Sequence, residues 1–262
     1  MANAFIFDVD GVLVDSPHEQ AWGEALKELM AKEWRELVPV TGYSPELYTP
    51  SVYQRHVAGR PRGDGAAALL AYFNIDDPDG ARADLLCNRK QRRIQRLMNG
   101  GDFRAYDDAL RFLVAAKAAG AKLAAASSSK NANTLLARLD FFGFCCRERL
   151  DYEFVTMGTT LPDLFDVNVC GRDCARGKPH PEIFVVAADA LGLTPEQCVV
   201  VEDAPNGVEA AKAGGMLCIG VARNDDAQLL ASAGADWVVN SLDELEPAQI
   251  MSRRAPLPAA TR

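Results

Sequence analysis

Two aspartates, Asp8 and Asp10, follow a short apolar run near the start of the chain, in the sequence FDVDGVLVDS. A carboxylate can attack phosphorus, and a second carboxyl group close by can exchange protons with the leaving or entering oxygen. On an extended strand both side chains would point to one face, so a turn after Asp8, helped by Gly11, must re-aim them. The pair would also suit magnesium. Alone, such a pair is more often a loop with two solvated carboxylates.

A second pair of acids, Glu202 and Asp203, follows the apolar run VVV in the sequence VVVEDAPNG. Two carboxylates at the end of a buried strand are costly unless they bind a cation or a basic group. We therefore expect them to complete a metal site with the first pair.

Basic and hydroxyl groups occur at two further places. The sequence KLAAASSSKN ends a predicted strand in serines and opens a helix with Lys130 and Asn131. Hydroxyl groups, helix N–H groups and an ammonium together suit a phosphate dianion, although serines at such a place also cap helices. In RGKPHPEIF, Lys178 could offset the nearby carboxylates and the charge of a transferring phosphoryl group, whereas alone it would be a surface lysine.

Apolar runs that predict strands alternate with predicted helices along most of the chain. The predicted strands are 4–8, 121–127, 165–170, 198–202, 216–221 and 236–239. The predicted helices between them are 105–119, 131–140, 181–191, 205–213 and 226–233. This alternation predicts an α/β fold in which a parallel sheet is covered on both faces.

The segment after the first strand is different, because it contains amphipathic helical patterns and no strong strand. These patterns cover 17–36, 63–73 and 79–98, whereas 37–53 reads as irregular and 141–164 is hard to place. We therefore expect three parts: an α/β core formed by 1–15 and 103–250, a helical cap at 16–102, and a disordered tail at 251–262. The insert would lie near the carboxyl end of the first strand, where open parallel sheets bind ligands.

Along the chain these four motifs come in the order Asp8 and Asp10, the serines with Lys130, Lys178, and Glu202 with Asp203. With the motifs in this order, the chain resembles the haloacid dehalogenase superfamily over about residues 4–240. The resemblance implies a Rossmann-like core with a helical cap inserted after the first strand, and Mg²⁺ as cofactor. It also implies the following roles: nucleophile and metal ligand for Asp8, general acid and base with a metal-bound backbone carbonyl for Asp10, phosphoryl binding for Ser127 and Lys178, and magnesium binding for Asp203 and Glu202.

Within that superfamily, SSSKN and the sequence GRPRGDG of the insert resemble the β-phosphoglucomutase-like subfamily. The resemblance implies that the substrate's non-reacting phosphate is held by Arg62, Ser129, Lys130 and Asn131. His18 resembles a histidine at the cap hinge of those mutases, although its spacing from Asp15 is shorter here. A bis-phosphorylated intermediate carries two dianions, so a second cationic cluster is physically required.

The core motifs leave the acceptor of the phosphoryl group open. Transfer to water would give a sugar-phosphate phosphatase, and transfer to a sugar hydroxyl would give a mutase, so exclusion of water is the distinguishing property. The sequence favours a mutase of the β-phosphoglucomutase kind, with a phosphatase as the alternative. A non-enzymatic sensor of phosphorylated metabolites would predict loss of Asp8, Asp10 or the lysine, and all three are present.

Composition limits the possible partners. The 262 residues are 48% hydrophobic and 24% charged, and the net charge of −8 disfavours nucleic acid as a partner. No apolar run approaches the length needed to cross a bilayer and the N-terminus has no basic leader, so we expect a cytoplasmic protein. We also expect a monomer or a weak homodimer. Seven cysteines without a CxxC pair fit free thiols.

Overall fold

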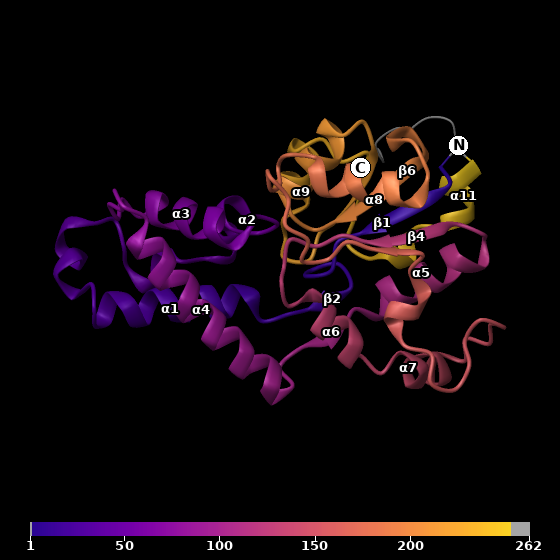
Figure 1. Ribbon diagram of the computed structural model, residues 1–262, viewed down its shortest axis with the longest axis horizontal. Coiled ribbons are helices and arrows are strands. Elements are labelled where there is room, and N and C mark those ends of the chain that lie inside the picture. The colour runs from indigo at the N-terminus through magenta and orange to yellow at the C-terminus, as the bar shows by residue number, and fades with distance from the viewer. Residues whose placement is uncertain (1, 253–262) are drawn as a thin grey trace. The chain divides into compact units, whose positions relative to one another are not determined.

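A computed structural model describes residues 2–252 of the chain, which forms two compact units. The first unit contains the residues up to Asp15 and those from Arg104 onward, and the second is Ser16–Phe103 (Figure 1).

A six-stranded sheet forms the centre of the first unit, and its strand order is β5-β4-β1-β6-β7-β8. All neighbouring strands run parallel. The strands are β1 (Ala4–Phe7), β4 (Lys122–Ala125), β5 (Val167–Asn168), β6 (Cys198–Glu202), β7 (Leu217–Val221) and β8 (Trp237–Val239). A separate antiparallel pair is formed by β2 (Val14–Asp15) and β3 (Arg104–Ala105). The expected α/β fold with a parallel sheet is confirmed.

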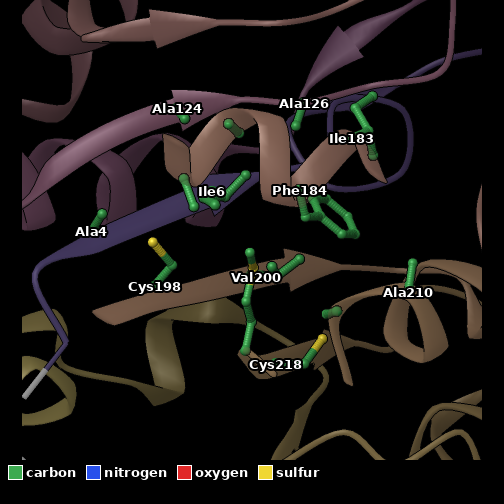
Figure 2. Close-up of a cluster of buried hydrophobic side chains, with 14 of the residues drawn as sticks. Ala4, Ile6, Ala124, Ala126, Ile183, Phe184, Cys198, Val200, Ala210 and Cys218 are labelled. Carbon is green, nitrogen blue, oxygen red and sulfur yellow. The ribbon is translucent and has the colours of Figure 1, made fainter. Parts of the chain in front are cut away.

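Helices cover both faces of this sheet because successive strand residues point to opposite faces. The helices of the first unit are α5 (Asp107–Ala118), α6 (Ala132–Arg138), α7 (Phe141–Glu148), α8 (Glu182–Leu191), α9 (Pro205–Ala213), α10 (Ala227–Ser232) and α11 (Pro247–Ser252). On one face Ile6 belongs to a buried cluster with residues of α8, α9 and α10, and Figure 2 shows it near Phe184. On the other face Phe5 meets Phe112 of α5 edge to face, with ring centroids 5.2 Å apart. In Figure 1, α8 and α5 accordingly lie on opposite sides of the sheet.

The second unit is helical and has its own apolar core. Its helices are α1 (His18–Ala31), α2 (Pro50–His56), α3 (Arg62–Tyr72) and α4 (Ala81–Gly100), with 3-10 turns η1 (Arg35–Val40) and η2 (Pro45–Leu47). α4 packs against α1 and α3. The buried cluster between these helices includes Trp22, Leu26, Leu69 and Phe73.

Three segments differ from the sequence-based expectation. Helix α2 begins inside 37–53, which we expected to be irregular. The Thr49 hydroxyl caps it by accepting from the N–H of Val52. Helix α7 and the 3-10 turn η3 (Leu161–Leu164) lie inside 141–164, and the Asp140 carboxylate caps α7. At the expected disordered tail, 251–252 belong to α11, and 253–262 lie outside the described residues.

None of the helices within residues 2–252 combines the length and the apolar character that crossing a bilayer requires.

Candidate active site

Three adjacent strands of the sheet end at the same place and carry the polar residues of the predicted motifs. In the register of the sheet, Phe7 lies between Ala125 of β4 and Val201 of β6. The backbone N–H of Asp8 continues this pairing by donating to the carbonyl of Val201 at 3.0 Å. The first acid pair, the serine run and the second acid pair therefore meet at the carboxyl edge of the sheet, as expected for a ligand site in this class of fold.

Lys178 joins the two acid pairs. Its Nζ donates to Asp8 Oδ1 and to Glu202 Oε1, at 2.6 Å in each case. The side chains of Lys178 and Glu202 are fully buried, and that of Asp8 is 7% exposed. The ammonium also lies 4.6 Å from the centroid of the Phe184 ring. A lysine from the loop before α8 thus fixes the orientation of the Asp8 carboxylate.

The electrostatics of this cluster follow from burial and from an excess of carboxyl groups. Burial raises the pKa of Asp8 above its usual range; Lys178 opposes this, and the carboxylates of Glu202 and Asp10 add to it. Burial alone would lower the pKa of Lys178, but its contacts with Asp8 and Glu202 outweigh that effect and raise it. Lys178 therefore stays charged at neutral pH.

Glu202 is held by groups of the protein itself. In addition to Lys178, its carboxylate accepts from the backbone N–H groups of Asp203 and Ala204, at 2.9 and 3.0 Å. A Cβ at Gly207 would lie only 1.8 Å from Glu202 Oε1, so the glycine makes room for this carboxylate. Glu202 therefore contacts Lys178 and the turn that follows β6, and its predicted contact with a metal stays a prediction.

Asp203 lies against the turn that follows Asp8. Gly11 adopts φ of 89°, and a Cβ there would be 1.9 Å from Asp203 Oδ2, so only glycine fits at this position. Burial raises the pKa of Asp203 well above its usual range, and the carboxylates of Glu202 and Asp8 raise it further. Buried carboxylates that repel one another in this way fit a bound cation, which would offset the repulsion.

A metal ion at this place would draw on carboxylates of the two acid pairs. Within the described part of the chain, no group of three or more His, Cys, Asp or Glu side chains could hold a metal ion. Asp8 and Asp203 are the candidate carboxylates for a cation, because Glu202 is held by two backbone N–H groups besides Lys178. Such a pair would need oxygens from the backbone or from water to complete the six that magnesium prefers.

Ser127 and Asp10 face each other at the mouth of the site. The hydroxyl of Ser127 lies 3.4 Å from Asp10 Oδ2 and accepts from the backbone N–H of Ser129 at 3.1 Å. The carbonyl of Ser127 accepts from the N–H of Gly171 at 2.8 Å, which fixes the strand end. The structure thus brings Ser127 and Asp10 together with the Asp8 cluster.

Lys130 has other partners in this structure. Its ammonium donates to the carbonyl of Gly171 at 2.7 Å and forms an ion pair with Asp173. The hydroxyl of Ser129 accepts from the N–H of Asn131 at 3.2 Å, just before α6 begins. Asn131 itself is buried.

The remaining two predicted residues belong to the helical unit. Arg62 is the first residue of α3, and His18 is the first residue of α1. The His18 ring contacts the buried ammonium of Lys90, with 2.7 Å between Nδ1 and Nζ. Lys90 also lies 5.3 Å from the centroid of the Trp22 ring.

Sequence analysis overlooked Lys90. Its place in α4 could have marked it, because Lys90 falls in the buried stripe of Leu86, Ile94 and Met98 at a spacing of four residues. A lysine in an apolar stripe is an exception that points to a specific polar partner.

The model of the haloacid dehalogenase-like hydrolase family matches residues 2–215, which is most of the chain. The chain belongs to this family. It is 34% identical over 257 residues to a β-phosphoglucomutase of Mycobacterium bovis, and the match covers 92% of this chain and 90% of that protein. It is 31% identical over 258 residues to validoxylamine A 7'-phosphate phosphatase of Streptomyces hygroscopicus, which covers 94% of this chain and 96% of that protein.

Solved structures agree with this assignment. The crystal structure of a β-phosphoglucomutase from Pyrococcus sp. strain ST04 matches with a TM-score of 0.66 and 28% identity, and the match covers 95% of this chain and 97% of that one. The resemblance to the superfamily and to its β-phosphoglucomutase-like subfamily is thus confirmed. The chain is an enzyme of the haloacid dehalogenase type, with both mutases and phosphatases among its relatives.

Proposed function

We propose that this enzyme transfers a phosphoryl group of a sugar phosphate through an aspartyl-phosphate on Asp8, and that it is a mutase of the β-phosphoglucomutase kind. The observation that carries the proposal is the placement of Asp8 at the end of β1, where its carboxylate is oriented by Lys178, with 2.6 Å between Nζ and Oδ1. The identity of 34% to a β-phosphoglucomutase along 92% of the chain supports the mutase reaction.

In the proposed reaction, Asp8 forms a bond to phosphorus while the bond between phosphorus and the leaving oxygen breaks. Asp10 gives its proton to that oxygen and then takes one from the next nucleophile. Lys178 opposes the rise in the pKa of Asp8 and orients its carboxylate, and its charge together with the Ser127 hydroxyl stabilises the transferring oxygens. A sugar hydroxyl as the next nucleophile gives the isomer, and water gives inorganic phosphate.

Magnesium is the proposed cofactor. Asp8 and Asp203 would hold it through their carboxylates, and Asp10 through its backbone carbonyl. When bound, the ion offsets the charge of the phosphoryl oxygens and of the clustered carboxylates. The raised pKa of Asp203, caused by burial and by the Glu202 and Asp8 carboxylates, supports a cation at this place.

A sugar-phosphate phosphatase is the second candidate. In the proposed mutase, Lys130 would help to bind the non-reacting phosphate with Arg62, Ser129, Asn131 and His18. In the structure Lys130 is engaged by Asp173 and Gly171, so a ligand would have to displace these contacts. A phosphatase needs no second phosphate site and would leave Lys130 as it is.

A single assay separates the two candidates. The enzyme is supplied with β-glucose 1-phosphate, magnesium and a trace of glucose 1,6-bisphosphate, and glucose 6-phosphate and free phosphate are followed together. The mutase predicts glucose 6-phosphate with little free phosphate. Free phosphate without the isomer would refute the mutase and favour the phosphatase, and neither product would refute both for this sugar. An Asp8→Asn variant serves as the control for contaminating activity.

A further inference from the structure

Arg223 spans from the end of β7 to the turn that carries Asp10. Its Nε donates to the carbonyl of Gly11 and its Nη2 to the carbonyl of Val12, at 3.2 Å in each case. Its Nη1 donates to Asp108 Oδ2 at 2.9 Å. The guanidinium carbon lies 3.8 Å from the centroid of the Tyr106 ring. With a side chain only 9% exposed, Arg223 is fixed on all sides by these four groups.

The turn that Arg223 contacts folds back on itself. The carbonyl of Val9 accepts from the N–H groups of Leu13 and Val14 at 2.9 Å each, and the N–H of Gly11 donates to the carbonyl of Val14 at 2.8 Å. Asp10 lies inside this closed turn. Its position therefore depends on the path of the backbone at Gly11, whose carbonyl accepts from Arg223.

Asp108 anchors the other end of the guanidinium. This buried carboxylate, near the start of α5, also accepts from the N–H of Leu242 at 2.8 Å and from the hydroxyl of Ser241 at 3.2 Å. Arg223 thus connects the turn to two other parts of the first unit. A lysine could not reproduce this arrangement, because its ammonium lacks the planar fork that donates in three directions.

We propose that Arg223 is a positioning residue that sets the location of the Asp10 carboxyl group relative to Asp8 and the phosphoryl group. The inference rests on the proposed role of Asp10 as general acid. Without Arg223, the carbonyls of Gly11 and Val12 lose their donors and the turn relaxes toward other conformations. Misplacement of a catalytic group by about 1 Å can reduce the rate by about 100-fold.

The role is tested with two aryl phosphates of similar size, phenyl phosphate and p-nitrophenyl phosphate. When the bond between phosphorus and oxygen breaks, phenolate is a strong base that needs the proton of Asp10, whereas nitrophenolate leaves readily without it. Arg223→Met is therefore expected to lower kcat/KM, which reports the steps up to transfer of the phosphoryl group to Asp8, about ten times more for phenyl phosphate than for p-nitrophenyl phosphate. Asp10→Asn should give the same pattern with a larger ratio.

Two further variants make the test robust to misfolding. Arg223→Lys keeps the charge and should show the same selective loss to a smaller extent. Asp108→Asn removes the anchor of Arg223, so the double variant Asp108→Asn, Arg223→Met should be no slower than Arg223→Met alone. Thermal unfolding of each variant checks that it folds.

Arg111→Met is the matched control. Arg111 lies in α5 and forms ion pairs with Asp243 and Glu148 at 2.6 and 2.7 Å, both of which lie outside the Asp10 turn. Its loss should leave the ratio of the two substrates unchanged. An equal fall for both substrates in the Arg223 variants, or no fall, would overturn the inference. Failure of Asp8 in the wild-type protein to gain a phosphoryl group from glucose 1,6-bisphosphate would instead overturn the proposed function, and the inference with it.

Discussion

At the scale of single residues, the site depends on one ammonium shared between two buried carboxylates. Lys178 contacts Asp8 and Glu202 at the same distance, so its charge orients the Asp8 carboxylate while Glu202 holds the lysine in place. Desolvating these groups is costly, and the cost is offset only while all three are present. A site of this kind is more readily explained by catalysis than by stability.

Replacing Lys178 should therefore destabilise the protein as well as inactivate it. Lys178→Met leaves two buried carboxyl groups without their partner, and we expect it to lower the free energy of unfolding by about 3–5 kcal/mol. Lys130→Met is the control for stability, because it removes an exposed ion pair and should cost less than about 1 kcal/mol. Urea unfolding measures both, and similar losses in the two variants would contradict the buried network.

Asp203 provides a test of the magnesium site. Because burial and the carboxylates of Glu202 and Asp8 raise its pKa, the ionised form is unfavourable in the metal-free protein. Asp203→Asn should thus melt no lower than the wild type without metal, yet lose the stabilisation that magnesium gives. For the wild type that stabilisation is about 2.7 kcal/mol at a magnesium concentration 100 times the Kd.

Asp166→Asn is the matched control for this measurement, since its carboxylate accepts from the N–H of Leu123 at the start of β4, away from the site. It should keep the full magnesium shift in melting temperature. If the Asp203→Asn variant also showed the full magnesium-induced shift in melting temperature, Asp203 would not be a ligand of the proposed metal.

At the scale of elements, the turn after β1 works because its glycine combines a left-handed backbone with close contact to Asp203. Gly11→Ala should cost about 1–2 kcal/mol through backbone strain alone, and in addition should weaken magnesium binding by displacing the carboxylate. Gly120→Ala separates the two effects, because Gly120 has a φ of 83° with open space around it. Isothermal titration with magnesium should show weaker binding for Gly11→Ala only; equal affinity in both variants would contradict the close contact.

The sequence predicted the elements of the first unit well for a physical reason. A buried parallel strand reads as a continuous apolar run, and its end is marked where the run changes to acids or serines, as at Asp8, Ser127 and Glu202. Short helices such as α2 and α7 were missed because their apolar period is too brief, although their caps at Thr49 and Asp140 were visible.

The contacts that connect distant parts of the chain could not be predicted in this way. Arg223 and Gly11 are 212 residues apart, and the sequence around Arg223 has no motif that marks it. Glu202 was expected to bind the metal because a pair of acids reads the same whether its partner is a cation or a lysine. The structure adds the contact of Glu202 with Lys178, which the acid pair alone does not reveal.

At the scale of the whole molecule, each unit has a separate apolar core. The cluster of the first unit draws on the sheet and on α8, α9 and α10, whereas that of the second draws on residues between 22 and 86. A loss of stability in one core should therefore not loosen the other directly.

Hydrogen exchange of the Lys178→Met variant can test this independence. We expect faster exchange in β1 and β6, and unchanged exchange in α1 and α4, because these helices pack on each other within the second unit. Peptides of α1 and α4 from the wild type are the reference. Faster exchange of both units to the same degree would show that they unfold as one.

The central claim is that Asp8 carries the phosphoryl group. The most direct measurement is to mix the enzyme with magnesium and glucose 1,6-bisphosphate, quench rapidly in acid, and determine the mass of the peptide that contains Asp8. We predict that this peptide gains the mass of one phosphoryl group, and that the gain is absent in Asp8→Asn, which is also inactive. A phosphoryl group on another residue, or appreciable turnover by Asp8→Asn, would contradict the mechanism.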